Sequence, residues 1–333
     1  MTIFNTSTRH ADGFPSPATD LNSYLTTSIN ETNFDSNYVT HCFRPTGDGA
    51  GIYYNIEHPA PSGDELWIHF NFKYNSPNTP DDGSLLVIYD SLNKPVFYIA
   101  VSNGNLYAYV YGEGSQSDLW NEMQGTPFKT IDIRLTTDGL ITKAQLFIDT
   151  VLIKGLETPN VVPTVGKPTR TLFNVNDMSY DSDAYVSEII IADEETRGMR
   201  LAEFSLTTPG TYSQFDEGDL TTSFDNIENT FTRSNNALQK TSGTIGAYTG
   251  ATINYEIKEV RINTRGWKTP NSSIGDFRHF IRTGGNDYEN TTLHTISSET
   301  RGVYTSSFTT NPATLVDWTF SDLVGLESGL KTE

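Results

Sequence analysis

The sequence predicts an all-β protein built from two antiparallel β-sandwich, jelly-roll-like domains in tandem. Three observations support this class. Apolar and polar residues alternate with a period of two in many short segments. Turns rich in glycine, asparagine, aspartate and proline separate these segments, and no long segment has the period of an amphipathic helix. A chain of 333 residues is long for one β domain and ordinary for two.

The first domain is expected over residues 1–198. ELWIHFNFKY (65–74) alternates regularly, so Leu66 and Ile68 face a core while Trp67 and His69 lie on the polar face. The next two segments, 84–90 and 95–102, are apolar almost throughout and flank a turn, which predicts a hairpin deep in a sheet. The remaining strands are expected at 105–112, 129–136 and 184–193, with two short strands joined by a turn within 144–155.

The second, smaller β sandwich is expected over residues 199–333. Its clearest alternation lies in ATINYEIKEVRINTRG (251–266) and DFRHFIRTGG (276–285). The seam between the domains is expected within YVSEIIIADEETRGMRLAEF (185–204). There the strand ends near Asp193, a corner ends at Gly198, and the second unit begins.

Composition argues against several classes of function. The formal net charge is −19 and there is no basic stripe, so the surface repels phosphate backbones and no nucleic-acid binding is expected. No segment approaches the roughly 20 apolar residues of a membrane span, so no membrane insertion is expected. The N-terminal residues have no signal-peptide pattern. Cys42 is the one cysteine, which leaves no intramolecular disulfide and no cysteine-based zinc site.

The acidic residues of the sequence are not expected to form the pair of carboxylates that glycoside hydrolysis requires. Retaining glycoside hydrolysis needs two carboxylates about 5–5.5 Å apart, which alternating acids on one strand supply. TIDIRL offers only Asp132, and Asp64 and Glu65 are adjacent and therefore face opposite ways. Asp193 and Glu195 are two apart but stand in the expected corner, where acids are usually solvated. We therefore expect no catalytic residues and a protein that is not an enzyme.

Histidine patterns add no catalytic constellation. The six histidines are scattered, and no Gly-x-Ser-x-Gly nucleophile elbow is present. His69 lies on the polar face of its strand and is expected to be exposed or hydrogen-bonded in a structural role. His279 shares a face with apolar neighbours and is expected to be a core histidine.

Aromatic residues are the remaining candidates for a contact site. Tyr107, Tyr109 and Tyr111 share one face of their strand, and Trp120 follows. Trp67 stands on the polar face of another strand. Aromatic rings stack on sugars, so these residues are candidates for contact with a glycan or a partner protein. The alternative, packing against a neighbouring sheet or subunit, is favoured.

The strand order of the first domain resembles the concanavalin A-like, laminin-G-like β sandwich. LFIDTVLI (146–153) stands where this family has a late strand pair of the type lFvDg.lv. The resemblance implies a lectin-like sandwich, a fold that also carries glucan hydrolases. Domains of this family often hold calcium in loops, which directs attention to Asp48, Asp81 and Asp82. Adjacent acids in a loop more often form a turn than a site, so neither a metal nor a cofactor is expected.

Two segments resemble virion proteins of tailed bacteriophages. They are VSEIIIADEETRGMRLAEFSL (186–206) and YTSSFTTNPATLVDWTFSDLVGLESGLKTE (304–333). In those proteins a lectin-like sandwich precedes a second β domain.

The resemblance implies a non-enzymatic structural protein on the exterior of a phage particle. A tail or tail-fibre component that attaches to a host surface glycan is expected first. Its partners would be other virion proteins and further copies of itself, with a trimer as first guess. Its location would be the virion, after assembly in the host cytoplasm. A capsid decoration protein and a free lectin are alternatives. A glycan-degrading enzyme on the same sandwich is the alternative of another class.

Overall fold

A computed structural model gives the fold. It describes residues 1–7, 25–26, 42–43, 53–74, 83–102, 105–110, 118–120, 129–138, 141–159, 166–174, 184–202, 204, 206–216, 234, 236–246, 255–268, 275–296 and 302–333. The expected all-β class is confirmed. Among these residues the sheets are antiparallel, and the helical structure is limited to a 3-10 turn at Phe320–Leu323. The chain divides into two compact units, one ending at Ala202 and the other beginning at Glu203.

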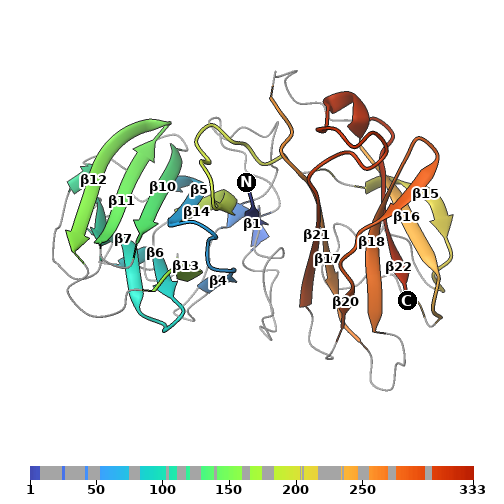
Figure 1. Cartoon of the computed structure of the whole chain (residues 1–333), viewed down its shortest axis with the longest axis horizontal. Helices are drawn as coiled ribbons and strands as arrows, with labels where there is room; N and C mark the ends of the chain where they lie inside the picture. Colours follow the sequence, from blue (N-terminus) through green and yellow to red (C-terminus); the bar gives the residue numbers. More distant parts are fainter. Residues whose placement is uncertain are drawn as a thin grey trace. The chain divides into compact units, whose positions relative to one another are not determined.

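One layer of the first unit is an eight-stranded sheet with the order β12-β11-β10-β5-β14-β3-β2, to which β1 adds by pairing with β14. In Figure 1, β10, β11 and β12 lie side by side in green. The strands are β1 (Ile3–Ser7), β2 (Leu25–Thr26), β3 (Cys42–Phe43), β5 (Glu65–Tyr74), β10 (Lys129–Thr137), β11 (Ile141–Ile148), β12 (Val151–Pro159) and β14 (Ala184–Ala192).

The other layer is a six-stranded sheet with the order β4-β13-β6-β7-β8-β9. Its strands are β4 (Tyr53–Glu57), β6 (Gly83–Asp90), β7 (Pro95–Ser102), β8 (Asn105–Val110), β9 (Asp118–Trp120) and β13 (Pro168–Asn174). A single apolar core joins the layers: Leu66, Ile68 and Phe70 from β5 are fully buried in one cluster with Phe97 and Phe173. The Phe70 and Phe173 rings meet edge to face at 5.3 Å.

Alternation on β5 places the residues next to these core positions on the outer face of the eight-stranded sheet. On this face the pairing register sets Trp67 opposite Arg134 and His69 opposite Asp132 on β10. The sheet is therefore apolar within the sandwich and carries aromatic and charged side chains outside.

A bulge on β14 supplies a further side chain to the outer face. The pairing of β14 with β5 shifts register between Ser187 and Ile190, and Glu188 has a φ of 50°. Glu188 is fully buried, which an acidic side chain tolerates only with partners. Those partners come largely from the segment after β14, and this segment was expected to start the second unit. Residues 199–202 belong instead to the first unit.

The second unit is a smaller sandwich. Its larger sheet has the order β15-β16-β22-β18-β19, with β20 paired to β18, and β17 and β21 form a separate two-stranded sheet. The strands are β15 (Leu206–Ser213), β16 (Lys240–Ile245), β17 (Val260–Gly266), β18 (Asp276–Thr283), β19 (Asn286–Glu289), β20 (His294–Thr295), β21 (Gly302–Phe308) and β22 (Glu327–Thr332). Ile281 of the larger sheet packs in one core with Ile262, Phe308 and Trp318.

A polar cluster lies between the two sheets of this unit. His279 is fully buried on β18, with its Nε2 atom 2.8 Å from Thr264 Oγ1 and its Nδ1 atom 2.7 Å from Ser306 Oγ. The side chain of His294 reaches the same Ser306 oxygen at 2.8 Å. Burial, together with the nearby His294, lowers the pKa of His279 to about 3. No helix in the described part of the chain is long and apolar enough to cross a membrane.

Candidate functional site

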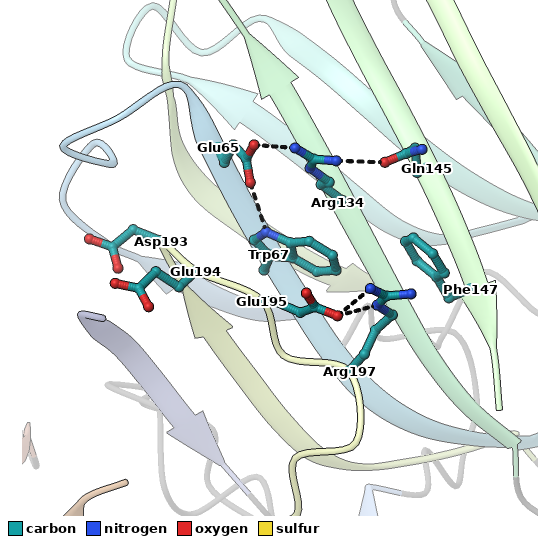
Figure 2. Close-up of a pocket in the computed structure, with 9 residues that line it drawn as sticks. All are labelled: Glu65, Trp67, Arg134, Gln145, Phe147, Asp193, Glu194, Glu195 and Arg197. Atoms are coloured by element: carbon teal, nitrogen blue, oxygen red, sulfur yellow. Dashed lines mark hydrogen bonds and ion pairs between the residues drawn. The ribbon is translucent and has the colours of Figure 1, made fainter. Parts of the chain in front are cut away.

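A pocket of about 510 Å³ opens on the outer face of the eight-stranded sheet, within the size range of small-ligand sites. Figure 2 shows its walls, which come from three neighbouring strands and from the segment that follows β14. The lining residues are Glu65 and Trp67 of β5, Arg134 of β10, Gln145 and Phe147 of β11, and Asp193, Glu194, Glu195 and Arg197.

Sheet register brings the strand residues together. Trp67 stands opposite Arg134, and Arg134 stands opposite Gln145 on the next strand. Residues two apart on a strand share a face, so Glu65 and Phe147 project on the same side as these three. Side chains far apart in the sequence thus form one continuous surface.

Two aromatic rings form the floor of the pocket. Trp67 and Phe147 stack with their ring centroids 5.8 Å apart, and they are only 4% and 5% exposed. The Arg197 guanidinium lies 4.4 Å from the Phe147 centroid, and that of Arg134 lies 5.8 Å from the Trp67 centroid. Guanidinium groups therefore cover the rings through cation–π contacts.

Glu65, Arg134 and Gln145 form one wall of the pocket, above the Trp67 indole in Figure 2, and Glu65 bonds to both Trp67 and Arg134. Its carboxylate accepts a hydrogen bond from Trp67 Nε1 at 3.1 Å and an ion-paired hydrogen bond from Arg134 Nη2. Arg134 Nη1 donates to Gln145 Oε1 at 3.0 Å. The hydrogen bond from Arg134 lowers the pKa of Glu65, and that from Trp67 acts in the same direction. Glu65 is consequently held in its ionised form.

The opposite wall belongs to residues 193–201, termed the strap. The strap lies on the outer face of the sheet and contributes three carboxylates and Arg197 to the pocket. Arg197 Nε and Nη2 both contact Glu195 Oε1. In Figure 2 this Glu195–Arg197 pair and Glu65 lie on opposite sides of the Trp67 indole.

Two anchors hold the strap on the sheet. Thr196, which is fully buried, donates to Asp132 Oδ1 at 2.9 Å. Arg200 donates through Nε and Nη2 to the two carboxylate oxygens of Glu188, each at 2.9 Å, and the backbone of Leu201 also donates to Glu188. The strap is thus fixed to β10 by a buried hydrogen bond and to β14 by partly buried hydrogen bonds to Glu188.

A buried polar pair lies two residues along β5 and β10 from the pocket residues Trp67 and Arg134. His69 Nδ1 is 2.9 Å from Asp132 Oδ1, and both side chains are fully buried. Within the described part of the chain, His69 Nε2 and Asp132 Oδ2 have no hydrogen-bond partner. His69 was expected to be exposed or hydrogen-bonded, and it is hydrogen-bonded: the strap covers this part of the polar face, so the side chain is buried against Asp132.

The structure separates the five aromatic candidates. Trp67 lines the pocket. Tyr107 and Tyr109 lie instead on β8 of the six-stranded sheet, where Tyr109 stacks on Tyr98 with centroids 4.4 Å apart. Tyr111 lies outside the described residues. Trp120 is placed on β9, and its side chain lies outside them too.

Sequence reasoning missed the carboxylates that meet at the pocket. It searched for acids alternating on one strand and judged Asp193 and Glu195 to be solvated in a corner. The structure places Glu65 on β5 and Glu195 on the strap, facing one pocket. A signal was available: Trp67 stands on the polar face of 65–74, and tryptophan is enriched at contact sites.

The metal candidates Asp48, Asp81 and Asp82 lie outside the described residues. Within the residues that are described, no three histidine, cysteine or acidic side chains are grouped to hold a metal ion.

Several solved structures are similar to this chain. The cellulose-induced protein Cip1 matches at 13% identity with a TM-score of 0.36, over 51% of this chain and 84% of Cip1. A Trypanosoma rangeli sialidase matches at 11% identity and 0.34, over 47% of this chain and 26% of its own length. The alginate lyase AlgAT5 of polysaccharide lyase family 7 matches at 16% and 0.33, over 57% and 94%. No protein-family model and no curated protein matches the chain.

These comparisons correct one expectation. We expected a protein that is not an enzyme, whereas the similar β-sandwich structures include a sialidase and an alginate lyase, which are enzymes. The expectation of a non-enzymatic protein is therefore withdrawn. The similar structures are lectin-, sialidase- and lyase-like β sandwiches, and none of them shows a phage origin. At these identities and TM-scores they assign no activity or substrate to this chain.

Proposed function

We propose that the protein recognises a saccharide in the pocket between β5, β10, β11 and the strap. The observation that carries this proposal is the arrangement of the lining groups. Carboxylates, guanidinium groups and a carboxamide surround an aromatic floor. Polar planar side chains of this kind accept and donate hydrogen bonds to neighbouring hydroxyl groups, and aromatic rings pack against the C–H faces of sugars.

The hydrogen-bonding wall of the pocket is formed without a bound ligand. Glu65, Arg134 and Gln145 hold one another in a fixed row, which reduces the conformational entropy lost on binding. The aromatic floor is less accessible, because Arg197 lies over the Phe147 ring. A sugar that stacks on the rings therefore requires the Arg197 side chain to swing aside, whereas a sugar held by the wall alone does not.

Cleavage of a bound glycan is a second candidate function. The specific observation in its favour is that Glu65 and Glu195 reach the pocket from opposite sides of Trp67. Glycoside hydrolysis uses two carboxyl groups that flank the bond to be broken. Glu65 has a lowered pKa, which suits a base or nucleophile.

One experiment tests both functions. The intact protein is titrated calorimetrically with a panel of oligosaccharides, and the same mixtures are assayed for newly formed reducing ends. We expect saturable binding that falls about tenfold or more in Gln145→Ala, because this change removes one part of the wall. Glu57→Gln, an exposed position on the other sheet, is the control. Binding that is equal in wild type and Gln145→Ala would contradict the assignment of the site.

The assay for reducing ends decides between the two functions. Their release, lost in both Glu65→Gln and Glu195→Gln, would support cleavage. Saturable binding without release would restrict the function to recognition.

A place on the exterior of a tailed phage particle is a narrower proposal. Its support is the resemblance of residues 186–206 and 304–333 to virion proteins, and saccharide recognition is the property that attachment to a host surface requires. A tail or tail fibre is favoured over a capsid position for that reason. Other virion proteins and further copies of this chain, with a trimer first, are the proposed partners. Imaging labelled protein in intact particles tests the location, and the mass of the purified protein in solution tests the copy number.

A further inference from the structure

The charge of the pocket distinguishes classes of saccharide. Four carboxylates and two guanidinium groups line it, which gives a net charge of −2. The ammonium group of Met1 pairs with Glu194, and the carboxylates still outnumber the cations when that group is counted. The whole chain carries −19, so the wider electrostatic field has the same sign.

Both guanidinium groups already have carboxylate partners. Arg134 donates to Glu65 and to Gln145. Arg197 donates to Glu195 and lies over Phe147. An anionic sugar is usually bound by a guanidinium group that offers two parallel donors to its carboxylate. Here such a ligand would have to compete with a carboxylate of the protein for each arginine.

We infer that the pocket takes a saccharide that carries no carboxylate or sulfate group, and that it discriminates against uronic and sialic acids. This inference rests on the proposed function and specifies its ligand class. Bringing an anion into a site with excess negative charge is unfavourable, since like charges in proximity destabilise a complex. Hydroxyl groups meet no such repulsion, because they both donate to carboxylates and accept from N–H groups.

The remaining hydrogen-bonding capacity of the wall fits hydroxyl groups. Each oxygen of the Glu65 carboxylate accepts one hydrogen bond from the described residues and retains a second lone pair. The Gln145 carboxamide accepts from Arg134 through its oxygen, and its NH2 group has no partner among the described residues. An acceptor and a donor thus stand on either side of Arg134, as neighbouring hydroxyls require.

The test uses pairs of ligands that share one sugar backbone and differ in whether their carboxyl groups are free or methyl-esterified. The intact protein is titrated with methyl-esterified and free oligogalacturonates, and with the methyl ester and the free acid of sialyllactose, at low and at high salt. We expect the neutral member of each pair that binds to bind about tenfold or more tightly at low salt, and the ratio to shrink as salt screens the repulsion. Tighter binding of the anionic member, or equal binding at low salt, would overturn the inference.

A variant adds an independent readout. Glu195→Gln removes one carboxylate and releases Arg197 from its ion pair, so the preference for the neutral member should fall at least several-fold. Glu57→Gln makes the same chemical change on the other sheet and should leave the preference unchanged. An unchanged preference in Glu195→Gln would overturn the inference. If no member of any pair binds, and no saccharide of the wider panel binds, the proposed function itself fails, which is a distinct outcome.

Discussion

The Thr196 hydroxyl donates a hydrogen bond of 2.9 Å to Asp132 Oδ1, and both side chains are fully buried although 64 positions separate them in the sequence. This contact joins the strap to β10 beside the pocket. Asp132 Oδ1 also contacts His69, so the hydroxyl is one of two partners of a buried carboxylate. The strap is consequently part of the first sandwich rather than a free connection.

The first prediction concerns this hydrogen bond. Thr196→Val keeps the shape of the side chain and removes its donor, which should lower the free energy of unfolding of the first unit by about 1–3 kcal/mol. Amide hydrogen exchange of β5 and β10 measures the loss. The control is Thr305→Val in the second unit, which removes an exposed hydrogen bond to Asn263 and should cost less than about 0.5 kcal/mol, as measured by exchange of β17 and β21. Equal exchange in the wild type and in Thr196→Val would disprove the anchoring role.

The second prediction concerns the buried acid on β14. Arg200→Met removes the guanidinium that pairs with fully buried Glu188. The Glu188 carboxylate then keeps two hydrogen-bond donors, the Asn71 side chain and the Leu201 backbone. The loss of stability should be about 3–5 kcal/mol, as for other broken buried ion pairs. Adding Glu188→Gln to this variant should restore part of the loss, measured as a coupling free energy in a double-mutant cycle. Strictly additive effects would show that the pair does not interact.

The third prediction is a pH dependence of the second unit. The pKa of His279 is lowered to about 3 in the folded chain, whereas an unfolded histidine has a pKa near 6.5. The unfolded state therefore binds more protons below pH 6.5. Stability is complete above that pH and falls by up to about 1.4 kcal/mol per pH unit between roughly 6.5 and 3.

Unfolding of the second unit at pH 7, 5.5 and 4.5 measures this slope. His279→Gln keeps a polar side chain between Thr264 and Ser306 and should reduce the slope. A wild-type slope that the substitution leaves unchanged would assign the acid sensitivity to other groups. His294, whose pKa burial also lowers, is the first of these.

The fourth prediction uses two glycines. A Cβ atom at Gly329 on β22 would collide with the Phe280 ring and with the backbone oxygen of Thr241. Gly329→Ala should therefore destabilise the second unit by about 1–3 kcal/mol or more. At Gly63 an added Cβ would meet nothing within 4 Å, so Gly63→Ala is the matched control. Thermal unfolding of both variants gives the comparison, and equal midpoints would show that β22 shifts to make room.

Local alternation was enough to predict which residues of a strand face the core, although only Val260–Gly266 of the alternating segment 251–266 forms a strand among the described residues. Leu66, Ile68 and Phe70 were expected on one face of their strand and are buried in the core. The reason is that alternate side chains of a strand point to the same face, so a period of two marks the face that is buried. The pocket could not be predicted in the same way. It depends on which strands are neighbours, and on Glu195 returning over the sheet on the strap. Pairing between β5 and β10 spans some 60 residues, and no local pattern encodes that contact.

The structure of the protein with a bound neutral oligosaccharide tests the central claim most directly. The account predicts the sugar on the outer face of the eight-stranded sheet, with hydroxyl groups on Glu65 and Gln145 and the strap along its side. A sugar seated on Tyr107 and Tyr109 of the other sheet, with the Glu65–Arg134–Gln145 row untouched, would contradict it.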